Sequence, residues 1–337
     1  MRKQVADKAG VSEATVSRVF SGSEAVKPKT RERVLQAASE LGYVPSELAR
    51  QFAKRRSGNI GVVLPYLPKV QLFSTYYFSE ILGGISEAAR ELGSDLLLLQ
   101  RSPDERREYG LLFRQRKVGG LIVLGARDGE EEREALLELE RDGHAYALVN
   151  QRMEGLEQRT VEADHREGSR LATAHLLEQG WSRPAFVGGP PDYSNSRDRL
   201  LGYRDAMSAA GAERLEPLVG NYSRKSGLEM ADAAARLIRS GEADALAAAN
   251  DRMAIGLLQG MRQLGLEAGR DYGLAGYDDS DGARLTQPAL TSVSASFYEM
   301  GRLAARMALG ELERPDRKLP PRLVVRESSL KRDVERN

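Results

Sequence analysis

The chain of 337 residues contains no cysteine, three histidines and one tryptophan. Without cysteine it can form neither a disulfide framework nor a thiolate metal site, and thiol catalysis is excluded. The histidines His144, His165 and His175 share no spacing that predicts a metal site. No apolar run approaches the roughly 18 residues of a membrane span, and Met1 leads straight into polar sequence. These absences favour a cytoplasmic protein with no membrane partner.

The length is too great for one compact core and is typical of two or three domains. Hydrophobic residues make up 41% and charged residues 29%, the balance of a globular protein. The net charge of +1 hides an asymmetry, because residues 1–57 carry 12 Lys and Arg against 6 Asp and Glu. The remaining 280 residues carry 38 against 43. This asymmetry indicates that only the N-terminal part meets a polyanion, although a solvated basic helix surface would give the same count.

Residues 1–45 have the pattern of three short helices. The first spans residues 2–9 and ends at Gly10, since glycine readily adopts the left-handed backbone that closes a helix. The second follows Ser12, a favoured N-cap residue, and runs to about Phe20. The third begins near Pro28, and we expect its apolar positions to be buried. These positions are Val34, Leu35, Ala38 and Leu41.

The second helix has two contrasting sides. Val16, Val19 and Phe20 form an apolar side at helical spacing. Two helices joined by a glycine-containing turn, the second with a polar outer side, form a helix-turn-helix. Its second helix fits the major groove, where an arginine can donate two hydrogen bonds to guanine. An ordinary three-helix packing unit has the same spacing, so the pattern alone leaves both readings open. The polar side comprises Glu13, Ala14, Ser17 and Arg18.

These segments resemble the DNA-binding head of the lac repressor (LacI/GalR) family. The similarity is carried by residues 5–6, 9–19, 30–34 and 41–45. A departure from the family is Lys27, which replaces a capping serine and adds a cation that can contact phosphate. A second departure is Met1, which stands where the family has the threonine that caps the first helix. The resemblance implies that Glu13, Ala14 and Arg18 read bases, and that Ser12, Thr15, Ser17 and Thr30 contact the groove or phosphates.

Residues 46–57 predict a helix of one or two turns followed by a basic stretch. A helix this short is marginal alone, since stable ones need about 12–15 residues. In the resembling family this segment folds in the minor groove beside its dimer mate, where a leucine wedges into a base step. Phe52 holds that position here, and phenylalanine is a known wedge residue. The alternative is a plain linker with one exposed aromatic side chain.

From Asn59 onward, apolar runs alternate with amphipathic helical segments, which is typical of βαβ units. Two series of runs predict two α/β lobes with a cleft between them, where ligands bind at the carboxyl ends of strands. No phosphate-binding glycine motif follows a strand, and nothing places a nucleophile on a strained turn. We therefore predict no catalytic residue, no metal and no cofactor. The runs are 60–64, 96–99, 120–124 and 145–149, then 185–188, 243–249 and 272–276.

Polar and aromatic side chains stand where these strands end. Amides, carboxylates and guanidinium groups pair with hydroxyls, and an aromatic face covers the apolar side of a ring. Such groups hold a sugar or nucleobase without reacting with it. Each residue alone is more often a helix cap or a solvated loop residue, but their repetition at strand ends favours a binding site. The residues are Asn150, Asn250, Asp251, Asp278, Asp279, Arg197, Arg199, Tyr77, Phe78 and Tyr222.

This part of the chain is similar to the ligand-binding core of the same family and, through it, to periplasmic sugar-binding proteins. Matching segments such as 60–65, 199–203, 249–251 and 276–279 extend the resemblance over essentially the whole chain. Residues 66–75 are about six residues longer than the family pattern, beside the expected cleft mouth. The resemblance implies that Arg199, Asn250 and Asp278 bind an effector, with Asn150 and Asn195 as weaker candidates, Tyr222 stacking on it, and Tyr77 and Phe78 lining the other lobe.

We therefore expect an all-α helix-turn-helix head followed by an α/β periplasmic-binding-protein-like core of two doubly wound parallel-sheet lobes. The resemblance implies a homodimeric transcription regulator, a repressor, whose affinity for a pseudo-palindromic operator responds to a small-molecule effector, a sugar or sugar derivative. The expected division is 1–45 head, 46–57 hinge, 58–330 core and 331–337 tail, with an N-lobe of about 58–160 plus 290–318 and a C-lobe of about 161–289 plus 319–330.

Two other classes of protein share such an α/β core. A solute-binding protein for transport needs a signal peptide and has no use for a basic three-helix head. A sugar-modifying enzyme needs a catalytic constellation, and the sequence shows none. Export of the native protein would favour the first class, and turnover of a candidate ligand would favour the second.

Overall fold

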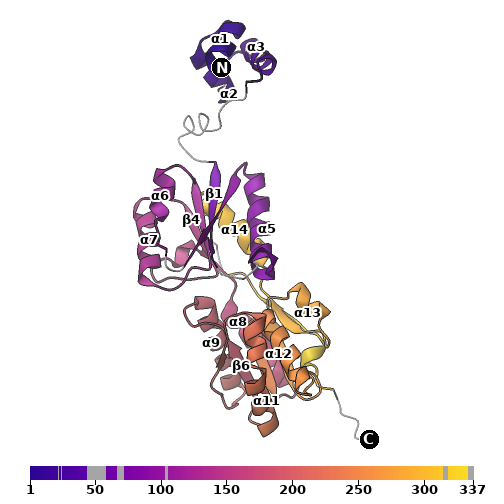
Figure 1. Ribbon diagram of the computed structural model, residues 1–337. Helices are drawn as coiled ribbons and strands as arrows, with labels where there is room; N and C mark the ends of the chain where they lie inside the picture. Colours follow the sequence, from indigo (N-terminus) through magenta and orange to yellow (C-terminus); the bar gives the residue numbers. More distant parts are fainter. Residues whose placement is uncertain are drawn as a thin grey trace.

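In the computed structural model, the described residues form a small helical head and two α/β lobes (Figure 1). The predicted hinge, residues 46–57 with Phe52, lies outside the described residues, as do residues 67–71 of the expected longer loop. No helix in the described part of the chain is long and apolar enough to cross a membrane. The described residues are 1–21, 23, 25–43, 58–66, 72–102, 105–313 and 318–332.

The head has its own hydrophobic core, built from one side of each of its helices. The chain leaves the first helix at Gly10, where φ is 62°, and Ser12 Oγ accepts the Thr15 N–H at 3.2 Å to cap the second. Lys27 precedes the third helix and forms no side-chain cap bond. The expected helix positions are therefore confirmed. The helices are α1 (Arg2–Ala9), α2 (Glu13–Phe20) and α3 (Pro28–Glu40).

One expected core position in α3 is wrong. Leu35 is 46% exposed, while Val34, Ala37 and Ala38 are buried. The inner side of a helix repeats at i, i+3 and i+4. Ala37 and Ala38 therefore lie on the same side as Val34, and the next residue, Leu35, points outward, about 100° away.

Helix α3 also contacts the carboxyl end of α2, because the Arg31 guanidinium donates to the carbonyl oxygens of Val19 and Ser23.

The first lobe is a five-stranded parallel sheet in the order β2-β1-β3-β4-β5. Alternate residues of β1 face opposite ways: Val62 packs with α5 and α14, whereas Val63 packs towards α6 and α7. The strands are β1 (Asn59–Pro65), β2 (Asp95–Arg101), β3 (Gly120–Leu124), β4 (Tyr146–Val149) and β5 (Thr160–Val161). The helices are η1 (Leu72–Ser74), α5 (Tyr76–Glu91), α6 (Tyr109–Arg114), α7 (Glu130–Arg141), η2 (Glu157–Arg159) and α14 (Phe297–Ala308).

The second lobe is a six-stranded sheet in the order β11-β10-β9-β8-β6-β7, parallel except for the β10–β11 pair. Apolar side chains of α8 and α9 pack on one face of the sheet, and those of α11 and α12 pack on the other. The strands are β6 (Pro184–Gly188), β7 (Leu218–Val219), β8 (Ala245–Ala248), β9 (Gly273–Tyr277), β10 (Thr291–Ser294) and β11 (Arg322–Val324). The helices are α8 (His165–Glu178), α9 (Ser194–Ala209), α10 (Arg224–Glu229), α11 (Ala231–Ser240), α12 (Asp251–Gln263), α13 (Asp281–Leu285) and η3 (Glu327–Ser329).

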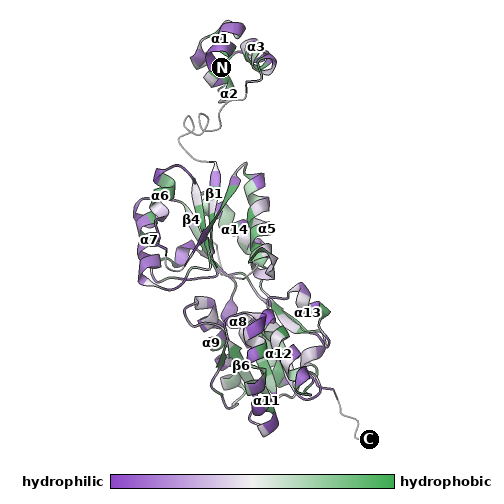
Figure 2. Ribbon diagram, in the orientation of Figure 1, coloured by the Kyte–Doolittle hydropathy of each residue, from purple (hydrophilic) through white to green (hydrophobic). Residues whose placement is uncertain are grey.

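The two lobes exchange segments, because the chain enters the second lobe after β5, returns to form α14, and crosses again to form β11. Strand β10 lies in the second sheet, paired with β9, so the expected boundary at residue 290 puts it in the wrong lobe. Figure 2 shows hydrophobic residues along the strands β4 and β6, and hydrophilic residues on the outer helix α7. The carboxyl ends of β4 and β9 meet between the lobes, because Asn150 and Tyr277 both bond to His165.

Candidate functional sites

The polar side of α2 is open to solvent. Glu13, Ala14, Ser17 and Arg18 are exposed, whereas Val16 and Val19 are buried against the rest of the head. At the start of α3, Lys27 is exposed and Thr30 is half-buried. A surface that reads DNA must leave its base-contacting side chains free to enter a groove. The head therefore presents the expected reading residues together, on the side of α2 opposite its core.

An ion pair on this surface escaped the sequence reasoning. The Arg2 Nε–H donates to Glu13 Oε2 at 2.9 Å, joining the first residue of α1 to the first residue of α2. The two residues are 11 positions apart, on different helices, and no periodicity links them. Only the packing angle of α1 against α2 brings them together.

In the core, the residues expected at strand ends converge. Asn150 follows β4, Asn250 follows β8 and Asp278 follows β9, and all three are buried. From the first lobe, Tyr77 at the start of α5 reaches this group, since Asn150 Nδ2 lies 3.4 Å from the Tyr77 hydroxyl oxygen. Phe78 packs edge-on against Tyr77, with ring centroids 4.9 Å apart. The cluster therefore takes side chains from both lobes.

Arg199 of α9 stands at the centre of the cluster. Its guanidinium lies 3.8 Å from the centroid of the Tyr277 ring and donates to the Ala249 carbonyl oxygen at 2.5 Å. Although the side chain is almost wholly buried, its Nε–H has no hydrogen-bond partner among the described residues. A buried donor left unpaired is costly and calls for an explanation, and an oxygen of a bound ligand supplies one.

His165, the first residue of α8, fixes the orientation of two of these groups. Its Nε2 lies 2.8 Å from Asn150 Oδ1, and its Nδ1 lies 3.0 Å from the Tyr277 hydroxyl and 3.3 Å from an Arg199 nitrogen. An amide oxygen and a guanidinium have fixed roles, so Nε2 carries the proton and Nδ1 accepts. Burial lowers the pKa of His165 well below its usual value, and the nearby Arg199 lowers it further. The ring is therefore neutral.

Tyr222 forms the aromatic wall of the cluster. Its hydroxyl bonds to Ser196 Oγ and lies 3.4 Å from Asn195 Oδ1, while its backbone carbonyl accepts from Asn250 Nδ2 at 3.1 Å. Asn250 is also a helix cap, because its Oδ1 accepts the Met253 N–H at 3.0 Å. Asn250 can therefore both cap α12 and bind a ligand, because the capping bond holds its amide at the edge of the cleft.

The backbone is strained at the same places. Six non-glycine residues of the described chain have positive φ, and three of them are expected effector residues: Asn150 at 57°, Tyr222 at 65° and Asp278 at 119°. Each such conformation costs about 1–3 kcal/mol and persists only where its surroundings enforce it, commonly at binding sites. The strain therefore supports the assignment of this cluster as a functional site.

Two carboxyl groups of the cluster differ in role. Burial raises the pKa of Asp278 well above its usual value, and the positive charge of Arg199 opposes this rise. Burial raises the pKa of Asp251 to about 6, while its oxygens accept from the hydroxyls of Ser280 and Ser292. Asp251 therefore ties the ends of β8, β9 and β10 together, whereas Asp278 lies within reach of the charge of Arg199.

Other polar residues named at strand ends have separate partners. Asp279 forms an ion pair with Arg326, and Arg197 forms one with Asp128 of the first lobe at 2.8 Å. The sequence reasoning missed His165, Tyr277 and Ser196. The sequence analysis considers His165 only as a metal ligand, but its place just after a short strand, where the chain crosses between the lobes, is a signal for a role between them.

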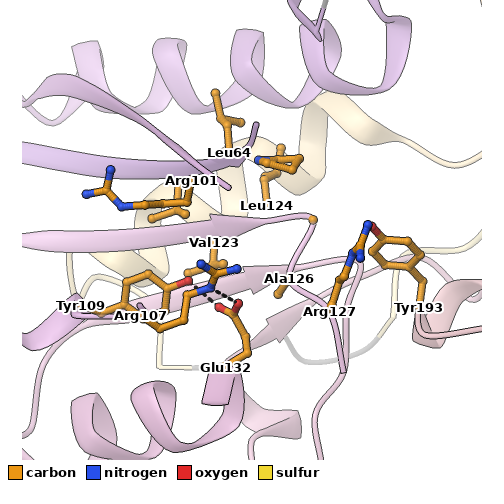
Figure 3. A pocket seen from close by; sticks show the side chains of 13 residues that line it. Leu64, Arg101, Arg107, Tyr109, Val123, Leu124, Ala126, Arg127, Glu132 and Tyr193 are labelled. Atoms are coloured by element: carbon orange, nitrogen blue, oxygen red, sulfur yellow. Dashed lines mark hydrogen bonds and ion pairs between the residues drawn. The ribbon is translucent and has the colours of Figure 1, made fainter. Parts of the chain in front are cut away.

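A hollow lies beside this cluster, at the carboxyl ends of β1 and β3 (Figure 3). One wall is cross-linked by hydrogen bonds, because Arg107 donates to Glu132 at 2.8 Å and the Tyr109 hydroxyl donates to the same carboxylate. At the other end Arg127 contacts Tyr193, whose ring lies 6.3 Å from that of Tyr222. The open space therefore adjoins the cluster of expected effector residues, which themselves pack on one another.

A helix-turn-helix head on a two-lobed core with a polar cluster between the lobes defines a class of DNA-binding protein with a ligand-binding core. Comparison with known families agrees. Residues 3–46 match the family model described as bacterial regulatory proteins, lacI family. Residues 173–329 match the model described as a periplasmic binding protein-like domain.

Whole-chain relatives give the same result. HTH-type transcriptional regulator CelR of Thermobifida fusca is 36% identical over 338 residues, 97% of each chain. The lactose operon repressor of Escherichia coli (strain K12) is 29% identical, over 97% of this chain and 89% of its own. The chain therefore belongs to the LacI family of bacterial transcriptional regulators.

Solved structures are similar over the same length. A CelR–cellobiose complex has 33% identity and a TM-score of 0.72, covering 97% of this chain and 99% of its own. The lac repressor dimer bound to operator and the anti-inducer ONPF has 26% identity and a TM-score of 0.81, covering 97% and 98%. The expected fold, a head followed by two periplasmic-binding-type lobes, is confirmed. The relatives are transcription regulators rather than enzymes.

Proposed function

We propose that the protein is a repressor that binds a pseudo-palindromic operator as a homodimer and responds to a carbohydrate effector held between its lobes. The observation that carries this proposal is the combination of two sites on one chain, an exposed reading helix and a buried, strained cluster of hydroxyl-binding groups. Its place of action is the cytoplasm, on chromosomal DNA. A two-fold pair of heads reads two half-sites of opposite direction.

On the DNA side, Arg18 donates to guanine in the major groove, Glu13 accepts from cytosine N4, and the Ala14 methyl group contacts thymine. The remaining contacts position the head without specifying sequence. The lac repressor dimer bound to operator supports this arrangement by similarity of fold. The positioning residues are Ser12, Thr15, Ser17, Lys27 and Thr30.

On the effector side, Arg199, Asn250 and Asp278 take the hydroxyls of the ligand, with Asn150 and Asn195 at its edge. Tyr222 stacks on one face of the sugar ring, and Tyr77 and Phe78 close the site from the other lobe. The unpaired Nε–H of buried Arg199 supports an oxygen-rich ligand. The relative whose structure is described as a cellobiose complex supports the carbohydrate class.

The response to the effector is a change in the angle between the lobes. The bonds from Tyr77 to Asn150 and from Asn150 to His165 join the lobes through one hydrogen-bonded chain. A ligand that replaces part of this chain favours a different lobe angle, and linkage limits the response to about 1–3 kcal/mol. The angle acts on the predicted hinge, where Phe52 is a minor-groove wedge.

The test has two arms. Selection from a random duplex pool should yield a two-fold symmetric site, bound in preference to random competitor. A thermal-shift screen of mono- and disaccharides, sugar phosphates and purines should find a ligand that raises the melting temperature, because binding to the native state alone stabilises it. Absence of any duplex preference, with or without ligands, contradicts the proposal.

Asp278→Ala separates the two sites. The variant should bind the selected operator as the wild type does but lose the effector response, measured by fluorescence anisotropy of labelled operator. A variant that responds fully would show that the effector binds elsewhere.

Phe52→Ala should reduce both operator affinity and DNA bending. If the variant bends DNA as much as the wild type does, Phe52 is not a wedge.

A further inference from the structure

The ion pair between Arg2 and Glu13 is not explained by stability. Both side chains are about half exposed, with 51% and 44% of their surface accessible. Exposed pairs contribute little to folding, since water screens the attraction and two long side chains lose freedom. The two residues nevertheless adopt a well-directed bond of 2.9 Å across two helices. The pair lies at the edge of the exposed polar side of α2, which we call the reading surface, and this position indicates a role in recognition.

Glu13 is a negatively charged residue at a position where it would approach DNA. It is the first residue of α2, and the N-terminal residues of a recognition helix are those that approach base edges. There its carboxylate can accept from the N4 amino group of cytosine, but it is also repelled by the phosphates that flank the groove. An acidic side chain can read a base here only if it is held in place and its charge is balanced locally.

Arg2 meets both conditions. The bond to Glu13 uses the Nε–H of the guanidinium, which carries four further N–H donors. One cation can therefore hold the carboxylate and still contact a DNA phosphate with its outer edge. The planar guanidinium also restricts the carboxylate to fewer orientations, which lowers the entropy lost on binding.

We propose that Arg2 is a positioning residue for Glu13 and that the pair acts as one reading unit, which sets a preference for cytosine at one position of each half-site. The proposal rests on the proposed function, because it requires the polar side of α2 to enter the major groove. The competing account is that Arg2 is a phosphate contact only, with Glu13 as a bystander.

The two accounts differ in what Arg2→Met changes. Loss of a phosphate contact weakens binding to all sequences equally. It also reduces the slope of the logarithm of the binding constant against the logarithm of the salt concentration by about 1. Loss of a positioning residue removes discrimination at one base pair. We expect the wild type to prefer its selected operator by about tenfold over the operator with that cytosine pair replaced. Arg2→Met should reduce this ratio to about twofold or less.

Three further variants make the test specific. Arg2→Lys keeps a cation that can pair with Glu13 and should retain part of the preference. Lys3→Met removes the adjacent exposed cation of α1 and should weaken both operators equally. Glu13→Gln should lose the preference by itself, and adding Arg2→Met to it should change the ratio no further. Melting curves followed by circular dichroism should show the head folded in every variant.

The outcomes separate cleanly. If Arg2→Met leaves the ratio of affinities for the two operators unchanged, the pair is not a reading unit. Equal weakening on both operators would make Arg2 a phosphate contact, and unchanged binding would make the ion pair irrelevant to recognition. A further loss of ratio when Arg2→Met is added to Glu13→Gln also overturns it, since Arg2 would then read a base independently. If the wild type itself distinguishes no operator, the proposed function fails first.

Discussion

The two candidate sites of this chain differ in how far their residues are exposed to solvent. In the head, the expected base-reading residues Glu13, Ala14 and Arg18 are exposed and belong to a regular helix with ordinary backbone angles. In the core, Arg199 and Asp278 are buried. A large polyanion brings its own electrostatic attraction to an exposed surface, whereas a small ligand must be taken out of water by groups already aligned.

Strain follows the same division. Asn150, Tyr222 and Asp278 have positive φ around the cleft, and no residue of the described reading helix does. A pocket that forces its backbone into these angles loses stability and gains alignment. The head needs no such backbone strain, because a regular α-helix already presents the polar side of α2 to the groove. Mutations should therefore affect stability strongly in the core cluster and weakly on the reading surface.

The largest expected effect is Arg199→Ala, which should destabilise the core by about 3 kcal/mol. The change removes a desolvated cation–π contact with Tyr277 and the hydrogen bond to the Ala249 carbonyl, leaving that oxygen unpaired. Denaturant unfolding of the full chain, followed by circular dichroism, measures the loss. A loss below 1 kcal/mol would show that the buried guanidinium is not held by these contacts.

Arg18→Ala is the counterpart on the exposed site. Its folding free energy should change little, but specific operator binding should weaken by about 1–3 kcal/mol, with base preference flattened at one position. Binding to the selected operator and to single-base variants gives both quantities. Unchanged binding to the selected operator would mean that α2 is not the reading helix, and equal weakening across all variants would make Arg18 a phosphate contact.

The exposed site was easier to predict from sequence than the buried one. Helix α2, its Ser12 cap and its polar side follow from spacing within eight residues. Asn150, Asn250 and Asp278 are candidates in the sequence analysis because each stands at the end of an apolar run. His165 and Tyr277 are not, because their roles depend on contacts between residues 112 positions apart. Leu35 and β10 show the same limit, since helix phase and strand partners are set by the assembled core.

The buried site should also make the free energy of unfolding depend on pH, through His165. The pKa of buried His165 is lowered in the folded chain, so below pH 6.5 the unfolded chain binds more protons than the folded one. The contribution of His165 to stability is therefore present above pH 6.5 and is lost progressively as the pH decreases below that value.

Comparison of wild type with His165→Gln isolates this effect. Glutamine can keep the donor to Asn150 but does not titrate, so the variant should lose less stability between pH 7.5 and 5.5. The subtraction is needed because Asp251, with a pKa of about 6, acts in the opposite direction over part of this range. Identical pH slopes for the two proteins would show that His165 is not held neutral by its surroundings.

The smallest expected effect tests whether an exposed contact between the lobes matters at all. Arg197 and Asp128 form an ion pair across the lobes at 2.8 Å, with nearly half of each side chain exposed. Water screens such a pair, so Arg197→Gln should change effector affinity by less than about threefold. The charge exchange Arg197→Asp with Asp128→Arg should restore whatever is lost, which separates pairing from a change in net charge. A tenfold shift in effector affinity would place control of the lobe angle on this exposed pair rather than on the buried cluster.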